Sequence, residues 1–256
     1  MLVAIDAGNT EIKIGCFTAD AALGDTWRIA TDPRRTPDEY AALLRQLFTA
    51  ARADLSAVDG VAVASVVPAL DATLETTCAR LFGATPLFLK PHVQSVIAMR
   101  TAYPQESGAD LVAAAIGGRQ RYGAPLIVVS YGTATVFVAI SAAGEYLGVA
   151  IAPGITISID ALIGRTAKLP QVALETPERA IGRTTVDALQ AGIVYGFAGQ
   201  TEAIVARMRA ELGDAARVVA TGGLAETFAK HVACVDAIDP ALSLMGLQVF
   251  YASSRR

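Results

Sequence analysis

The sequence contains few of the residues from which metal centres and disulfide frameworks are built. Among its 256 residues there are only three cysteines and two histidines. Cys16, Cys78 and Cys234 lie far apart and form no C-x-x-C pair, which argues against both a zinc site and a disulfide framework. The three thiols are therefore expected to be small buried hydrophobic groups in a protein from a reducing compartment.

Charge is also scarce. Charged residues make up 18% of the chain and the net charge is −3, with lysine and arginine scattered. This distribution provides no basic patch for nucleic acid. The sequence has no uninterrupted apolar stretch of about 20 residues, the length that crosses a bilayer. The apolar N-terminus reaches Asp6 too early for a signal peptide. We therefore expect a cytoplasmic protein with neither a nucleic-acid nor a membrane partner.

Apolar residues are abundant, at 53% of the chain, and predict a compact, enzyme-like protein with one large domain or two smaller ones. Alternating apolar runs predict strands in the first half, and amphipathic periodicity predicts helices. The expected strands span 2–5, 12–17, 25–30, 60–67 and 86–90, and the expected helices span 36–51 and 68–82.

The second half repeats this order about 124 residues later. Its expected strands span 126–130, 134–140, 145–151, 217–221 and 233–238. Its expected helices span 106–122, 154–168, 184–211 and 240–252, with a short helix after the Gly222-Gly223 turn. The pattern predicts an α/β protein with a duplicated core, divided into halves 1–121 and 122–256.

The repeat is clearest in two loops, within "LVAIDAGNTEIKI" from Leu2 and "LIVVSYGTATVFV" from Leu126. Gly8 matches Gly132, Asn9 matches Thr133, and Asp6 matches Ser130. A glycine turn with amide or hydroxyl neighbours exposes the N–H donors that bind a nucleotide phosphate. The alternative is a type I′ hairpin turn at Gly8-Asn9 with positive φ and no ligand.

Several ordered motifs give the sequence a family resemblance. They are "IDAGNT" (5–10), "SGAD" (107–110), "YGTAT" (131–135), "GVAIAPGI" (148–155), "RTAKLP" (165–170), "IGRTT" (181–185), "AGIVYGF" (191–197) and "ATGGLA" (220–225). With these motifs the chain resembles the type III pantothenate kinases, which belong to the actin-like ATPase superfamily. The resemblance implies two ribonuclease-H-like halves, ATP in the cleft between them, and a homodimer whose pantothenate site uses both subunits.

The resemblance also implies roles for individual residues. Asp6 would position Mg²⁺ and the ATP phosphates, and Asp110 would accept the proton of the pantothenate hydroxyl. The residues alone allow another role for Asp110, as the N-cap of a helix beginning at Leu111. The nucleotide would be held by Asp6, Ala7, Gly8, Asn9, Thr10, Glu11, Ile12, Lys13, Gly132, Thr133, Gly222 and Gly223. Pantothenate would be held by Thr101, Tyr103, Gly108, Ala109, Asp110, Leu111 and the neighbouring subunit's Thr185. Glu11 is expected to turn away from the phosphates along its strand.

The sequence departs from the family pattern at three positions. Ser130 replaces an aspartate that helps bind K⁺ or NH₄⁺, Leu111 replaces an arginine, and Thr101 stands where a tyrosine is usual, with Tyr103 nearby. The leading hypothesis is an ATP-dependent pantothenate kinase. One alternative is a degenerate homologue with little turnover that acts as an accessory or regulatory binding protein. Another is a kinase for an acceptor without a carboxylate.

Overall fold

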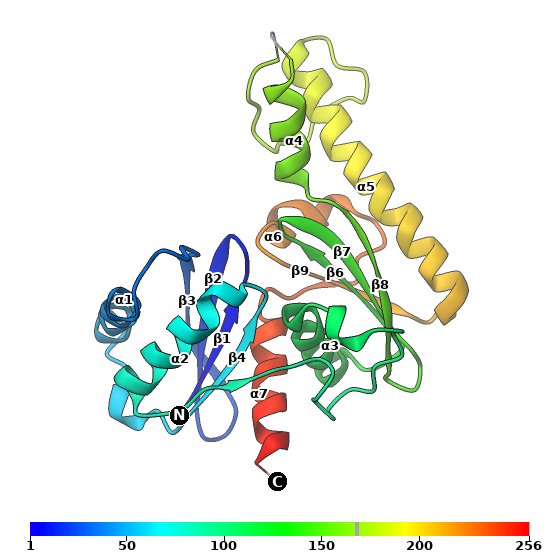
Figure 1. Cartoon of the computed structure of the whole chain (residues 1–256). Coiled ribbons are helices and arrows are strands. Elements are labelled where there is room, and N and C mark those ends of the chain that lie inside the picture. Colours follow the sequence, from blue (N-terminus) through cyan, green and yellow to red (C-terminus); the bar gives the residue numbers. More distant parts are fainter. Residues whose placement is uncertain (167–168, 256) are drawn as a thin grey trace. The chain divides into compact units, whose positions relative to one another are not determined.

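The computed structural model describes residues 1–166 and 169–255, and the chain divides into two compact units. Unit 1 comprises Met1–Gln120 and Leu242–Arg256, and unit 2 comprises Arg121–Ala241. Each unit contains a five-stranded mixed sheet with helices packed on it, shown for both in Figure 1. The predicted α/β class and its two related halves are thus present.

The sheet of unit 1 begins with an antiparallel meander of β1 (Leu2–Ala7), β2 (Glu11–Phe17) and β3 (Leu23–Ala30). Strands β4 (Gly60–Ser65) and β5 (Leu87–Phe88) follow in parallel orientation, because helices connect them. The resulting order is β3-β2-β1-β4-β5, with β1 at the centre. Five of its six residues are apolar and all six are buried, as expected for a central strand covered on both faces.

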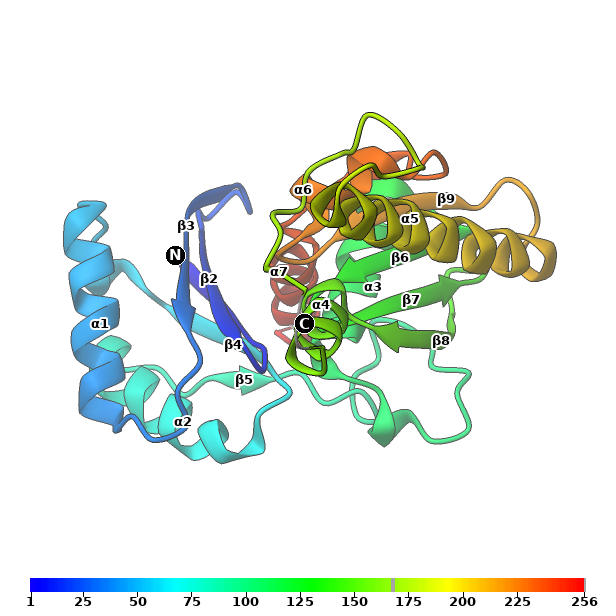
Figure 2. The same ribbon diagram turned by 90° about the horizontal axis from the view of Figure 1, so that it is seen from above.

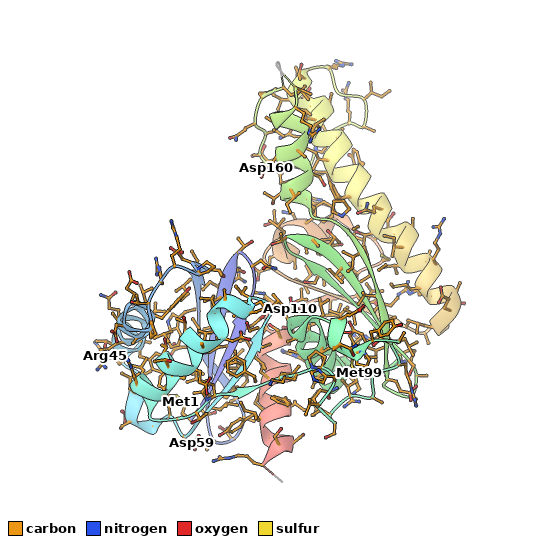
Figure 3. All side chains as sticks on the ribbon, in the orientation of Figure 1. Met1, Arg45, Asp59, Met99, Asp110 and Asp160 are labelled. Atoms are coloured by element: carbon orange, nitrogen blue, oxygen red, sulfur yellow. The ribbon has the colours of Figure 1, made fainter. Side chains whose placement is uncertain are left out.

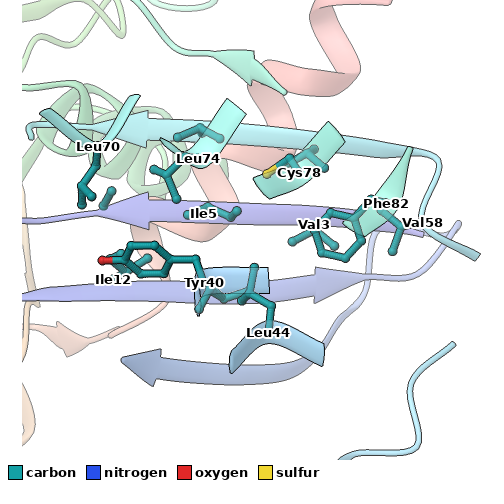
Figure 4. Packing of buried hydrophobic residues seen from close by; sticks show 14 of the residues in the cluster. Val3, Ile5, Ile12, Tyr40, Leu44, Val58, Leu70, Leu74, Cys78 and Phe82 are labelled. Atoms are coloured by element: carbon teal, nitrogen blue, oxygen red, sulfur yellow. The ribbon is translucent and has the colours of Figure 1, made fainter. Parts of the chain in front are cut away.

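One face of this sheet is covered by α1 (Pro37–Ala50) and α2 (Pro68–Phe82). Helix α1 begins as predicted at Thr36, whose side chain forms a capping box with Glu39. The two helices bury a continuous apolar cluster against β1, β2 and β4, part of which is shown in Figure 4. The cluster includes Val3, Ile5, Ile12, Tyr40, Leu44, Leu70, Leu74, Cys78 and Phe82.

The other face of the unit 1 sheet is covered by the C-terminal helix α7 (Leu242–Ser254), which contacts β1, β2 and β4. Helix α3 (Ala109–Tyr122) packs closely against α7. A Cβ atom on Gly246 would lie 1.7 Å from the carbonyl oxygen of Ala113, so only glycine permits this approach. The expected half 122–256 therefore differs from unit 2 at its C-terminal end. The last helix buries its apolar side on the first sheet, a pairing that local patterns do not reveal.

Unit 2 repeats the topology of unit 1. Strands β6 (Leu126–Tyr131), β7 (Ala134–Ile140) and β8 (Tyr146–Pro153) form the antiparallel meander. Strands β9 (Arg217–Thr221) and β10 (Ala237–Ile238) extend the sheet in parallel. The order β10-β9-β6-β7-β8 is that of unit 1 read from the opposite edge, which confirms the duplication inferred from the sequence.

Helix α5 (Thr185–Leu212) crosses one face of the unit 2 sheet, as Figure 2 shows, and packs there with the short α6 (Ala225–Phe228). Their core includes Ile127, Val129, Tyr131, Phe137, Val205 and Phe228. Helix α4 (Ile155–Gly164) and the N-terminal part of α5 extend together beyond the sheet (Figure 1).

Several element boundaries differ from the expected ones, most clearly those of β5, β10, α3 and α4. The strands expected over 86–90 and 233–238 are each only two residues long, as edge strands with one neighbour. Helix α3 begins at Ala109 because a 3-10 turn, Pro104–Glu106, occupies the expected first turn. Helix α4 ends at Gly164, and Lys168, its expected end, lies outside the described residues. Among the described helices, none combines the length and apolar character needed to cross a membrane.

Candidate active site

Asp6 is a buried carboxylate at the centre of the unit 1 sheet. Its side chain is 6% exposed and lies near the end of β1, one residue before the loop begins. Side chains alternate along a strand, so Val3 and Ile5 face α1 and α2 whereas Asp6 faces α7. Lys13 lies directly opposite on β2 and therefore shares the face of Asp6.

The Asp6 carboxylate is held by a residue from the other end of the chain. The hydroxyl of Ser243 on α7 donates a hydrogen bond to Asp6 Oδ2 at 2.5 Å. Among the described residues, the other oxygen, Oδ1, has no hydrogen-bond partner although it is buried. Burial raises the pKa of Asp6, and the charge of Lys13 and the Ser243 hydrogen bond oppose this effect. One oxygen is therefore fixed and the other is left free for a ligand.

Asp110 lies in the first turn of α3 (Figure 3), so it is not the residue that precedes the helix. Its Oδ1 accepts a hydrogen bond from the Leu111 N–H at 2.8 Å. The expected N-cap at Asp110 is thus wrong, because α3 already begins at Ala109. A Cβ atom on Gly108 would lie 2.5 Å from Asp110 Oδ1, so the glycine of the "SGAD" motif leaves room for this carboxylate.

The two carboxylates influence each other. Burial raises the pKa of Asp110 to about 6, with a further contribution from the negative charge of Asp6. A carboxylate with this pKa is ionised at neutral pH but is more basic than an ordinary aspartate. Together, Asp6, Lys13 and Asp110 form a cluster of two acids and one base on unit 1.

This cluster fits a divalent cation that is bound mainly by phosphate and water. The orphaned Oδ1 of Asp6 is a hard oxygen donor of the kind that Mg²⁺ prefers. No group of three or more His, Cys, Asp or Glu suited to a metal occurs within 1–166 and 169–255. Mg²⁺ typically takes one or two carboxylates and completes its shell with substrate phosphates.

The loop after β1 is ordered by a neighbouring strand end. Thr31 donates from its hydroxyl to Gly8 O at 2.7 Å and from its N–H to Thr10 O at 3.0 Å. Neither Gly8 nor Asn9 has positive φ, so the expected type I′ turn is wrong. The turn is longer, with the Gly8 N–H bonded to Glu11 O at 3.1 Å, and ordinary φ values suffice.

The remaining residues expected in this loop differ in what they can contribute. Ala7 and Ile12 are packed into the apolar cluster, so only their backbone is available to a ligand. Asn9 and Thr10 are exposed. Glu11 shares the face of Lys13, with its carboxylate 3.9 Å from the Arg28 guanidinium on β3. Its charge is therefore partly balanced by a neighbour on the sheet.

In unit 2 the corresponding loop is supported by glycines. A Cβ atom on Gly154 would lie 2.2 Å from Thr133 O, and one on Gly222 would lie 2.4 Å from Tyr131 O. Gly222 also has φ of +96°, which favours glycine. Protein backbone therefore fills the space on the Cβ side of Gly222, and its contact with a nucleotide stays a prediction. Gly223 is the exposed member of the pair.

Ser130 occupies the position on β6 that Asp6 occupies on β1. Its cross-strand partner on β7 is Val136, whereas the partner of Asp6 is Lys13. Both charges of the first pair are therefore replaced by uncharged residues in the second. The repeat preserves the strand and the turn but not the electrostatics.

The residues expected to hold the acceptor lie before and within the start of α3. Thr101 has a buried hydroxyl oxygen with no hydrogen-bond partner in the described part of the chain, whereas Tyr103 is 61% exposed. Leu111 is half-buried and brings no charge. Gly108 and Ala109 line a pocket of about 410 Å³ that lies entirely within unit 1.

Thr185 belongs to unit 2, where it is exposed at the first position of α5. The preceding Thr184 caps this helix in a capping box with Asp187. The sequence analysis did not identify Ser243 as a site residue. Its only local signal is a serine in an apolar helix, which becomes meaningful once α7 is placed against β1.

The comparisons with known sequences match most of the chain to one family. The family model described as type III pantothenate kinase matches residues 2–207. The type III pantothenate kinase of Moorella thermoacetica is 49% identical over 251 residues, covering 98% of each chain. That of an Anaeromyxobacter species is 47% identical over 255 residues and covers 100% of both.

Solved structures share the fold at much lower identity. A putative 2-dehydro-3-deoxygalactonokinase from Sinorhizobium meliloti matches with a TM-score of 0.62 at 12% identity, covering 99% of each chain. A conserved putative Baf family transcriptional activator from Campylobacter jejuni matches with a TM-score of 0.61 at 19% identity, covering 99% of this chain and 98% of that one. At this identity they show the fold alone, which is that of the actin-like ATPases.

The hydrogen bond from Ser243 generates a prediction. Ser243→Ala removes the donor to Asp6 Oδ2, and hydrogen bonds to charged groups contribute about 1.5–3 kcal/mol. We expect the affinity for Mg²⁺-nucleotide to fall about tenfold, measured by calorimetric titration. Ser254→Ala is the matched control, because its hydroxyl donates to Phe250 O within the same helix and is far along α7 from Ser243. A variant that merely unfolds at lower temperature, with unchanged affinity, would contradict the role given to Ser243.

Proposed function

The chain belongs to the type III pantothenate kinase family, and we propose that it transfers the γ-phosphate of ATP to the hydroxyl of pantothenate. The product is 4′-phosphopantothenate, and the reaction is the first step of coenzyme A biosynthesis. The observation that carries the proposal is the pair Asp6 and Asp110, which is retained beside Lys13 on unit 1.

In the proposed reaction Asp110 is the general base. Its carboxylate is ionised at neutral pH and accepts the proton of the acceptor hydroxyl as that oxygen attacks the γ-phosphorus. Lys13 offers a positive charge and the loop after Asp6 offers N–H donors to the phosphates. Asp6 would hold Mg²⁺ through its free Oδ1. The bound cation would offset the phosphate charge during transfer.

We also propose a homodimer that pairs through helix α5. In residues 1–166 and 169–255, a Cβ atom built on Gly192, Gly196 or Gly199 would meet no atom within 4 Å other than those of its chain neighbours and of the helix's own backbone nearby. Tyr195 and Val186 on the same helix are exposed, as is Ile181 just before it at 84%. A bare glycine-containing apolar helix is the surface that a second copy can approach closely. Such pairing would allow Thr185 to contact the pantothenate of the neighbouring subunit.

One observation favours a second candidate function, that of a non-catalytic pantothenate-binding homologue. Ser130 and Leu111 are both uncharged, and both stand where the family resemblance implies a charge. The deciding experiment is incubation of the purified protein with ATP, pantothenate, Mg²⁺ and K⁺, with 4′-phosphopantothenate detected by mass spectrometry. Binding of pantothenate without any product would support the second function and exclude the first.

Replacing Asp110 by asparagine should separate catalysis from stability. In the unfolded chain its pKa is about 4, and in the fold it is about 6. The folded form therefore binds the proton more readily, and stability decreases as pH rises from about 4 to about 6. Asp110→Asn should lower turnover about 100-fold or more and raise the melting temperature at pH 8.

The gain in melting temperature should disappear below pH 4, where the aspartate of the unmodified protein is itself neutral. Thermal unfolding followed from pH 4 to pH 8 tests this dependence. If Asp110 were mainly a structural helix residue, Asp110→Asn would instead lower the melting temperature at pH 8, and activity would fall in proportion to unfolding.

The dimer is tested by introducing a charge into the bare face of α5. Tyr195→Asp should convert the protein to a monomer in light scattering at micromolar concentration, because an isolated buried charge is costly. Activity should fall with dissociation if the partner's Thr185 completes the site. Glu211→Lys, a charge change in the last turn of α5, is the control. A monomeric unmodified protein with full activity would refute the proposal.

Ser130→Asp tests the monovalent cation. The new carboxylate would face Val136, so no lysine on β7 would neutralise it, and a cation could do so. We expect the unmodified protein to respond weakly to K⁺, and Ser130→Asp to show greater activation by K⁺ and greater thermal stabilisation by KCl than by choline chloride. Strong K⁺ activation of the unmodified protein would show that the Ser130 hydroxyl and the backbone suffice.

A further inference from the structure

Three charged residues lie in one row across the sheet of unit 1. Asp6 on β1 is directly opposite Lys13 on β2, and Lys13 is directly opposite Arg28 on the edge strand β3. Side chains of residues that are directly opposite on neighbouring strands point to the same face of a sheet. Arg28 therefore extends the pair Asp6–Lys13 by one strand, and the proposed reaction has given it no role.

A fourth charge on this face comes from Glu11. It precedes Lys13 by two residues on β2, so the two side chains leave the strand on the same side. The cross-strand partner of Glu11 is Ala30, which places Arg28 diagonally from it, within reach of a long side chain. The Glu11 carboxylate is 3.9 Å from the Arg28 guanidinium, and the two side chains are 34% and 45% exposed. Glu11 is thus paired with the edge strand.

The charge of Glu11 also reaches the buried acid. Burial is the main cause of the raised pKa of Asp6, and the negative charge of Glu11 adds to it, while Lys13 and the Ser243 hydrogen bond oppose it. Burial and the charge of Asp6 raise the pKa of Asp110 to about 6, and Lys13 again opposes them. Lys13 therefore balances two carboxylates, and a nucleotide would bring further negative charge to the same ammonium group.

The stability of the sheet does not account for Arg28 at this position. Like charges that are directly opposite, as Lys13 and Arg28 are, destabilise an antiparallel pair of strands. A partly exposed ion pair, such as that of Arg28 with Glu11, contributes little to folding. A role in the neighbouring ligand site explains the arrangement better than a role in stability.

We propose that Arg28 is a positioning residue for the nucleotide: it pairs with Glu11 and so keeps Lys13 available to Asp6 and to the nucleotide phosphates. The inference rests on the proposed function, because the nucleotide is the phosphate donor of that reaction. Arg28 itself touches no reacting atom. Without it, Glu11 would be free to pair with Lys13, which would leave an unbalanced negative charge where the phosphates bind.

The test measures the affinity for a non-hydrolysable ATP analogue with Mg²⁺ by calorimetric titration, without any acceptor. Arg28→Gln should weaken binding about fivefold, the scale for a partly exposed charge. Arg28→Lys retains the charge and should bind as the unmodified protein does. Adding Glu11→Gln to Arg28→Gln should restore the affinity, because the competing carboxylate is then absent. Arg34→Gln is the matched control, since Arg34 forms its ion pair with Asp32, and it should change nothing.

A merely structural role gives a different pattern. Arg28→Gln would then lower the melting temperature, and Glu11→Gln would restore neither stability nor affinity. That result would overturn the inference, as would an affinity that Arg28→Gln leaves unchanged.

The two proposals can fail separately. If the unmodified protein forms 4′-phosphopantothenate and Arg28→Gln binds the analogue equally well, the role of Arg28 is wrong while the kinase function stands. If no product forms but the affinities follow the expected order, the kinase function fails and the inference holds. An unmodified protein that neither binds the analogue nor forms product overturns both.

Discussion

The site of unit 1 depends on one constraint, the burial of the Asp6 carboxylate on the central strand β1. An ionised group in such a place requires compensation, or it takes up a proton instead. Asp6 receives it from the Ser243 hydroxyl at 2.5 Å and from the positive charge of Lys13 on the adjacent strand. Burial and, to a lesser extent, the negative charge of Asp6 raise the pKa of Asp110 to about 6, so the basicity on which the proposed role of Asp110 depends originates partly in Asp6.

This arrangement explains why the chain returns to its first unit at the end. Ser243 lies 237 residues after Asp6 and reaches it because α7 lies flat on the face of β1 that carries the acid. Gly246 and Gly117 permit that position, since a Cβ atom on either would collide with the backbone of the facing helix. Close helix packing thus determines the hydrogen bonding of a carboxylate on a distant strand.

The sequence predicted those elements whose signals are local. Helix α1 begins after Thr36 where expected, and the matched registers of the two loops predicted two sheets of one topology. What it could not predict depends on contacts between distant segments. Ser243 has no motif, Gly222 serves backbone packing against Tyr131, and the pocket beside Gly108 gathers residues from four separate segments. The roles proposed for Asp6 and Asp110 rest on the family resemblance, whereas the influence of Asp6 on the pKa of Asp110 depends on how the fold brings them together.

The two copies of the loop share their backbone arrangement and differ in their charges. Strand order, cross-strand register and the turn glycine are common to both units, because each is needed to close a sheet around a buried central strand. The pair Asp6–Lys13 is not needed for that purpose, and in unit 2 it becomes Ser130–Val136.

Both charges are absent together from unit 2, which is physically consistent, since either one alone would lack a partner in its hairpin. The second loop retains what backbone can offer a phosphate, namely N–H groups fixed by glycine packing at Gly154 and Gly222. The proposed acid–base chemistry therefore belongs to unit 1, which alone of the two repeats carries the acid–lysine pair.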